Sequence, residues 1–154
     1  METGILLNNR ILDVVFLAWF IAQAYKFCRE LLINRKVEVS RIWGTGGMPS
    51  SHSSTVTSLA TAVGIVHGYS STYFAIAFTF AGIVMYDAAG IRRSAGKQAA
   101  IINRLMDKIH QSQFISGVQE EKLKELLGHT PFEVLVGALL GIVVSYVFKN
   151  YLIV

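Results

Sequence analysis

Apolar residues are concentrated in four stretches of this chain, which polar or charged connections separate. The stretches are Ile11–Cys28, Ser53–Tyr69, Thr72–Met85 and Phe132–Phe148. A helix needs about 20 apolar residues to cross a bilayer, so the first stretch must continue to Ile33 to reach that length. The second is rich in Ser, Thr, Ala and Gly, which allow helices in a membrane to approach closely, and we expect it inside the bundle.

A different pattern runs from Ala99 to His110, where apolar residues recur at helical spacing with polar residues opposite. It predicts an amphipathic helix at the membrane interface or on the bundle. A linker over Gln111–Gly117 and a short charged helix over Gln119–Leu127 should follow. The chain is therefore predicted to be one all-α domain, residues 1–154: an integral membrane helical bundle of about four transmembrane helices plus an amphipathic interfacial helix.

Composition agrees with a membrane location. Apolar residues make up 53% of the chain and the mean hydropathy is +0.48, against an apolar share of about 45–50% in soluble proteins. Cys28 is the single cysteine, which excludes an intrachain disulfide and a CxxC metal pair. Met1–Arg10 lacks the features of a signal peptide, so we expect the first apolar stretch to remain in the mature protein.

The basic residues predict the orientation of the helices. Of fourteen, five lie in the connection from Lys26 to Ser51 and seven in the connection from Gly90 to Thr130. With four spans both connections lie on one side, which the positive-inside rule makes cytoplasmic. The net charge of +4 therefore indicates an anionic membrane surface rather than nucleic acid. The expected location is the plasma or inner membrane.

Two short stretches carry the candidate chemistry. Gly46–Ser54 is a hydroxyl-rich turn that contains His52 and precedes the second apolar stretch, and Gly128–Glu133 repeats this design with His129 before the fourth. Unpaired N–H groups and the helix dipole make a helix start suitable for binding phosphate. A histidine there can exchange a proton near neutral pH. The predicted topology brings both starts, and the pair Arg92–Arg93, to the cytoplasmic side.

Taken as one site, these residues suit phosphoryl transfer. Arginines, serines and helix N–H groups can hold the non-bridging oxygens. A neutral histidine can attack phosphorus, a second, protonated one can supply the proton of the leaving oxygen, and a carboxylate can orient the nucleophile. No metal is required, and two histidines without nearby third and fourth ligands make a poor metal site. The candidates are His52, His129, Glu133, Arg92, Arg93, Ser50, Ser51 and Ser53.

Structural roles remain open for the same residues. Thr130 and Glu133 form a T-x-x-E capping box with Pro131 at the first helical position, so Glu133 would then bond only to backbone. The two histidines would be ordinary interface residues. The two arginines would bind lipid headgroups or set the topology.

These motifs resemble the type 2 phosphatidic acid phosphatase superfamily, which also contains acid phosphatases and vanadium haloperoxidases, and most closely its small divergent membrane branch. Pro49–His52 matches the Pro-Ser-Gly-His motif, with Ser51 in place of glycine. His129–Glu133 matches His-x-x-x-Asp, with glutamate in place of aspartate, and Arg92-Arg93-Ser94 is similar to the Ser-Arg start of that motif. Lys26 is the candidate for the Lys motif, although no Arg-Pro follows it. The resemblance covers nearly the whole chain.

The resemblance implies a helical membrane phosphatase that needs no metal or other cofactor. Because the predicted site faces the cytoplasm, the expected substrate is a membrane lipid phosphate of the phosphatidic acid or phosphatidylglycerol phosphate type rather than undecaprenyl pyrophosphate, whose recycling site is expected outside. His129 would form a phosphohistidine, His52 would be the general acid and Glu133 would orient His129. Arg93, Arg92 and Lys26 would hold phosphate.

Other hypotheses remain open at this point. The alternative is a catalytically silent membrane scaffold that binds lipid headgroups or other anions. Kinship also raises vanadate-dependent peroxidation, as a weaker hypothesis. Gly137 and Gly141 have the small-xxx-small spacing that permits a homodimer but equally serves packing within the bundle.

Overall fold

The computed structural model describes residues 4–34, 47–111, 123 and 128–154, and all regular structure in these residues is helical. The elements are α1 (Arg10–Asn34), α3 (Ser51–His67), α4 (Thr72–Tyr86), η1 (Asp87–Ile91), α5 (Arg92–Gln111), α6 (Pro131–Val147) and α7 (Lys149–Ile153). η1 is a turn of π-helix. The all-α prediction is confirmed for the described part of the chain.

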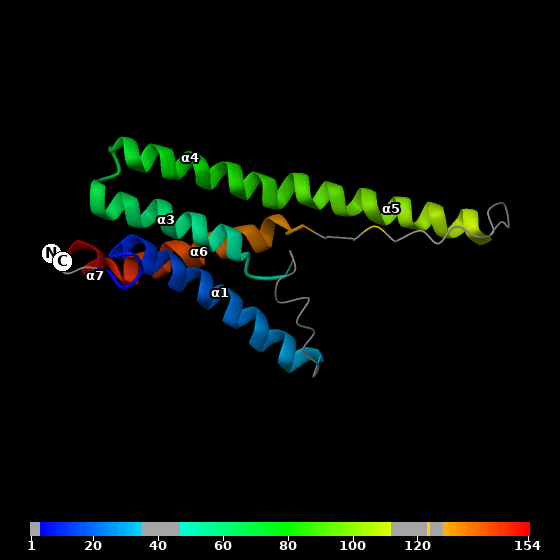
Figure 1. Ribbon diagram of the computed structural model, residues 1–154, viewed down its shortest axis with the longest axis horizontal. Helices are drawn as coiled ribbons and strands as arrows, with labels where there is room; N and C mark the ends of the chain where they lie inside the picture. Colours follow the sequence, from blue (N-terminus) through cyan, green and yellow to red (C-terminus); the bar gives the residue numbers. More distant parts are fainter. Residues whose placement is uncertain (1–3, 35–46, 112–122, 124–127) are drawn as a thin grey trace.

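Helix α3 lies at the centre of the bundle and packs against α1, α4 and α6. α1 and α4 run in one direction and α3 and α6 in the other (Figure 1). As a result, α7 and the start of α1 lie together at one end of the bundle, where Tyr151 donates a hydrogen bond to Asp13. The starts of α3 and α6 lie at the opposite end, which holds the candidate site.

Small side chains explain the central place of α3. Its hydroxyl groups reach carbonyls and hydroxyls of the neighbouring helices: Ser54 Oγ donates to the Ala18 carbonyl (3.1 Å) and Thr57 Oγ1 to the Ala138 carbonyl (3.0 Å). Ser58 Oγ lies 3.0 Å from Ser145 Oγ. These bonds satisfy polar groups that are buried away from water. The prediction that this apolar stretch lies inside the bundle is confirmed.

Gly137 and Gly141 form the face of α6 that contacts α3. A Cβ atom on Gly137 would overlap the Ser50 carbonyl, and one on Gly141 would overlap the Ser54 carbonyl and the Thr57 hydroxyl. The two helix backbones can approach this closely only because both positions are glycine. In this structure the small-xxx-small face therefore serves packing within the chain.

A side chain caps the start of each of these two helices. The Ser50 side chain caps α3, and Thr130 caps α6 through a complete capping box with Pro131 in the first turn. Pro49 lies before the cap of α3 rather than in its first turn. α1 continues past Cys28 to Asn34, as a membrane-spanning length requires.

α4, η1 and α5 form one continuous helix, of which α5 extends well beyond the bundle (Figure 1). The amphipathic helix therefore begins at Arg92 instead of Ala99, and it continues η1 away from the bundle instead of packing on it. Its placement at the membrane interface stays a prediction. The predicted linker beyond residue 111 and the charged helix at 119–127 fall outside the described residues, apart from Leu123.

Two helices in the described residues are long and apolar enough to cross a membrane, Arg10–Leu32 and Thr72–Ile109. α6 is apolar but shorter. Large apolar side chains cover the outside of these helices, including Phe16, Ile76 and Leu139, and an exposed apolar surface of this extent is typical of contact with lipid or another protein. The predicted number of four spans stays a prediction.

Candidate active site

Backbone contacts bring the predicted motifs to one place. The Ser50 N–H donates to the Glu133 carbonyl (3.1 Å), which joins the start of α3 to the start of α6. Gly128 packs so closely on the backbone of Arg92 and Arg93 that a Cβ atom there would overlap it. Segments more than 30 residues apart in the sequence therefore meet beside His129.

His129 is held inside this junction with an exposed fraction of 2%. Its Nδ1 lies 3.3 Å from Glu133 Oε2. A carboxylate accepts hydrogen bonds, so this contact assigns the proton to Nδ1 and leaves the lone pair on Nε2. Nε2 is buried and has no hydrogen-bond partner among the described residues. Because buried polar atoms nearly always have a partner, Nε2 indicates a ligand position.

Glu133 fills both roles that the sequence left open. Its Oε2 accepts a hydrogen bond from the Thr130 N–H (2.9 Å), and Thr130 Oγ1 accepts one from the Glu133 N–H (3.3 Å). The same Oε2 contacts His129 Nδ1. The capping box thus fixes the carboxylate at the position from which it orients the imidazole.

His52 lies on the first turn of α3 and remains exposed to solvent. Its ring centroid is 6.1 Å from that of His129, and the two rings meet edge to face. One imidazole is therefore buried and fixed by a carboxylate, while its neighbour remains in contact with water. This asymmetry suits different roles for the two histidines.

Cations from two helices surround the histidines. Lys26 on α1 donates to Ser51 Oγ (3.4 Å) and acts electrostatically on both imidazoles. Arg92 Nε lies 2.7 Å from Asp87 Oδ2, and its side chain is half-exposed. Lys26, the weakest of the sequence candidates, is therefore placed beside the site.

The environment lowers the pKa of both histidines. Burial is the main cause for His129, followed by the charge of Lys26, while Glu133 opposes the shift. Partial desolvation lowers the pKa of His52, and the charges of Arg92 and Lys26 add to it. Both imidazoles are therefore more readily neutral than an ordinary histidine, which suits a nucleophile better than an acid.

The three predicted serines differ in position. Ser50 and Ser53 are fully buried and bonded to each other, with 3.0 Å between their Oγ atoms, and the Ser53 N–H also donates to Ser50 Oγ. Their hydroxyls therefore stabilise the helix start. Ser51 differs from them because it contacts Lys26. Arg93 is half-buried, with its backbone against Gly128.

Asp87 is the residue near the site that the sequence motifs do not include. It pairs with Arg92 and opposes the lowering of the pKa of His52. The available signal is an acidic residue shortly before the Arg-Arg pair. The π-helical turn that brings positions 87 and 92 together has no comparable signature in the sequence.

The fold of the described residues is helical and has two apolar helices of membrane-spanning length. Two neighbouring histidines lie among cations at one end of it. These features are those of a helical membrane protein with a paired-histidine site. The chain belongs to the Divergent PAP2 family, whose model matches residues 7–144. It is 41% identical over 156 aligned residues to Uncharacterized membrane protein YuiD of Bacillus subtilis (strain 168). The alignment covers 95% of this chain and 98% of that protein. No solved structure matches the chain at a significant level. The family resemblance inferred from the motifs is thus confirmed.

Proposed function

We propose that this protein is a phosphatase that hydrolyses a membrane lipid phosphate, of the phosphatidic acid or phosphatidylglycerol phosphate type, at the cytoplasmic face. The buried Nε2 of His129 carries the proposal. Glu133 contacts the opposite ring nitrogen, which leaves the lone pair on Nε2, and Nε2 has no hydrogen-bond partner among the described residues. Family membership supports phosphatase-related chemistry.

In the proposed reaction His129 Nε2 attacks phosphorus, and the bond between phosphorus and the ester oxygen breaks. His52 gives its proton to the leaving oxygen, so the first product departs as an alcohol. Water then attacks the phosphohistidine while His52 accepts a proton from it, and phosphate leaves with His129 restored. Lys26 and Arg92 stabilise the charge on the non-bridging oxygens.

The lengths of the helices support a lipid substrate. α3 and α6 have 17 residues each, which is about 25 Å, whereas the hydrocarbon core of a bilayer is about 30 Å thick. If both helices span the membrane, their starts lie at or just below the level of the lipid headgroups, because the helices are a few ångströms shorter than the core. A lipid phosphate can then reach the histidines without leaving the bilayer.

The test is phosphate release by detergent-solubilised protein from phosphatidic acid and from phosphatidylglycerol phosphate, with and without EDTA. We expect EDTA-resistant release that His129→Ala abolishes. His67→Ala is the matched control, because His67 lies at the opposite end of α3, and it should retain full activity.

The covalent step has a separate readout. Brief mixing with ³²P-labelled substrate followed by denaturation should trap acid-labile, base-stable radiolabel on the protein, and His129→Ala should remove it. Because His52→Ala removes the proton donor, it should slow both formation and breakdown. If folded protein releases no phosphate from either lipid and traps no label, the headgroup-binding scaffold replaces the phosphatase hypothesis.

A further inference from the structure

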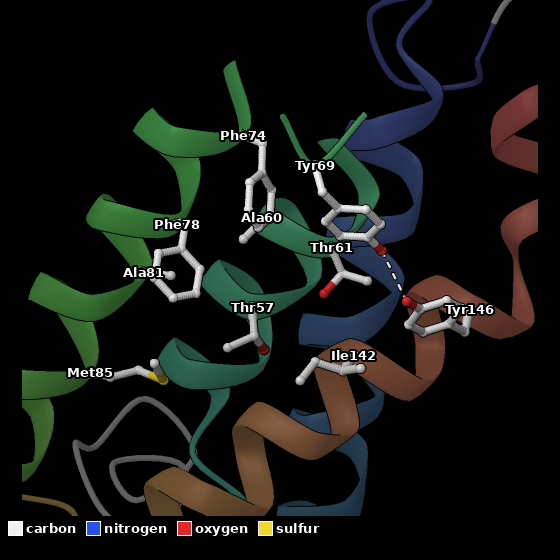
Figure 2. A pocket seen from close by; sticks show the side chains of 10 residues that line it. All are labelled: Thr57, Ala60, Thr61, Tyr69, Phe74, Phe78, Ala81, Met85, Ile142 and Tyr146. Atoms are coloured by element: carbon white, nitrogen blue, oxygen red, sulfur yellow. Dashed lines mark hydrogen bonds between the residues drawn. The ribbon is translucent and has the colours of Figure 1, made fainter. Parts of the chain in front are cut away.

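A groove runs between α4 and α6, with α3 as its floor (Figure 2). Its volume is about 250 Å³. The floor consists of small, buried side chains, whereas the walls are formed by larger and more exposed ones. The floor residues are Thr57, Ala60 and Thr61, and the wall residues include Phe74, Phe78 and Met85 of α4 and Ile142 and Tyr146 of α6.

Apolar side chains form most of the groove surface, and three of its four hydroxyl groups already have partners. The Thr57 hydroxyl donates to the Ala138 carbonyl (3.0 Å). Tyr69 and Tyr146 close one end, where their hydroxyl oxygens lie 2.9 Å apart (Figure 2). An apolar chain would therefore meet a mostly hydrocarbon surface, in which the hydroxyls of Thr57, Tyr69 and Tyr146 need no water partner.

The opposite end of the groove lies beside the candidate site. Thr57 follows His52 by five residues, or about 7.5 Å along the helix axis. Met85 is two residues before Asp87, the partner of Arg92. The groove thus starts next to the histidines and leads away from them along the helices.

Its length is close to the depth that one acyl chain fills in a leaflet, although its closed end, at Tyr69 and Tyr146, lies near the ends of α3 and α6 that are far from the histidines. From Phe74 to Met85 the helix rises about 16 Å at 1.5 Å per residue, and half of a hydrocarbon core of about 30 Å is about 15 Å. The walls are open on one side, since Phe78 is 64% and Ile142 37% exposed. A chain could therefore enter laterally from the membrane.

We propose that this groove binds one acyl chain of the lipid whose phosphate occupies the histidine site. This inference rests on the proposed function, because the site determines where the headgroup lies. A helix of a second copy is about 10 Å in diameter or more, which is too wide for about 250 Å³ spread over this length. The groove would therefore set the preference of the enzyme for long acyl chains.

Blocking the groove with Ile142→Trp tests the proposal. We expect kcat/KM for dioleoyl phosphatidic acid to fall by roughly 10-fold or more, the scale of misfit in an apolar pocket. Hydrolysis of p-nitrophenyl phosphate, which has no acyl chain, should stay near the wild-type rate. Val143→Trp is the matched control, because Val143 is the next residue on α6, is exposed, and does not line the groove.

A second measurement does not depend on turnover. Phosphatidic acid with a diazirine in the middle of one acyl chain is photolysed with the protein, and the labelled peptide is identified by mass spectrometry. We expect labelling of α4 around Phe78 and Met85, lost in Ile142→Trp and retained in His129→Ala.

The two proposals fail in different ways. Groove labelling without phosphatase activity would overturn the proposed function and support the groove as an acyl-chain site. Phosphatase activity with labels on α1 or on a second copy would overturn the groove. Equal loss of both substrates in Ile142→Trp with no loss in Val143→Trp would overturn it as well.

Discussion

At the scale of single residues, the site is built around a contrast between two histidines. His129 is buried and bonded through Nδ1 to a carboxylate that a capping box holds in place. His52 is exposed and faces cations. The reaction needs a lone pair on His129 and a proton on His52. The pH dependence of the rate should therefore depend on the pKa values of both histidines.

We expect kcat/KM to be highest at acidic pH, below the ordinary histidine pKa of about 6.5. The pKa of His52 is lowered, so its proton is lost as pH rises through that lowered value, and the rate falls. The pKa of His129 is also lowered, so the nucleophile becomes protonated, and the rate falls again, as pH drops through that second lowered value. In the pH profile of kcat, the fall in rate on the basic side should come at higher pH than in the profile of kcat/KM. The reason is that the bound phosphate anion raises the pKa of His52.

The variant Arg92→Gln tests whether the charge of Arg92 contributes to the lowered pKa of His52. Removing this charge raises the pKa of His52, so the basic limb of the kcat/KM profile should move to higher pH. Lys149→Gln, in the short α7 helix beyond the far end of α6, should leave both limbs unchanged. An unmoved limb in Arg92→Gln would show that His52 is not the acid.

Thr130 and Glu133 allow the cap to be separated from the orientation of His129. Glu133→Gln retains an oxygen that accepts from the Thr130 N–H but removes the charge, so kcat should fall by roughly 10²–10⁴-fold with little loss of stability. Thr130→Ala should lower stability by about 1 kcal/mol with kcat near the wild-type value. Thermal unfolding in detergent and steady-state kinetics measure both. Parallel losses in the two variants would mean that Glu133 serves only the cap.

At the scale of elements, the contact between α3 and α6 positions the site, since the two histidines lie at the starts of these helices. The backbones approach closely at Gly137, where a side chain would meet the Ser50 carbonyl. Ser50 is also the cap of α3 and the donor to the Glu133 carbonyl. Packing and site geometry therefore depend on the same few atoms.

Gly137→Ala should consequently lower stability by about 1–3 kcal/mol, the usual range for overpacking, and should reduce activity by separating the two helix starts. Gly82→Ala is the control, because a Cβ atom there meets nothing within 4 Å, and alanine favours a helix by up to about 1 kcal/mol. The midpoint of thermal unfolding in detergent should thus fall in the first variant and stay equal or rise in the second. Equal changes in the unfolding midpoint of the two variants would contradict the close approach of α3 and α6 at Gly137.

Much of this arrangement could be predicted from the sequence because its causes are local. The caps at Ser50 and Thr130 and the small residues of α3 are readable from residue types. Lys26 is a candidate only through the family resemblance, because its contact with Ser51 depends on how α1 packs against α3 and no local pattern reveals that. The sequence does not predict that α4 continues through η1 into α5. Gly90 favours a loop there, and the π-helical turn that takes its place has no sequence signature.

At the scale of the whole molecule, the arrangement agrees with the charge pattern. The start of α1 and α7 lie at the end of the bundle opposite the histidines (Figure 1), whereas Lys26 and Arg92, two described basic residues of the connections, lie at the histidine end. Four spans with a cytoplasmic site would produce this arrangement. The orientation decides the substrate, because a lipid phosphate made in the cytoplasmic leaflet can reach the histidines only if they face that side.

Orientation can be measured with single cysteines, starting from Cys28→Ser to remove the only native thiol. Ser70→Cys lies in the turn between α3 and α4, and Gln98→Cys on α5; both positions are exposed. We expect a membrane-impermeant maleimide to label Ser70→Cys in intact cells and Gln98→Cys only after permeabilisation. The reverse pattern would place the histidines outside and favour a substrate such as undecaprenyl pyrophosphate, whose recycling occurs there. Equal labelling of both in intact cells would exclude the four-span arrangement, since α4 would then not separate the two positions.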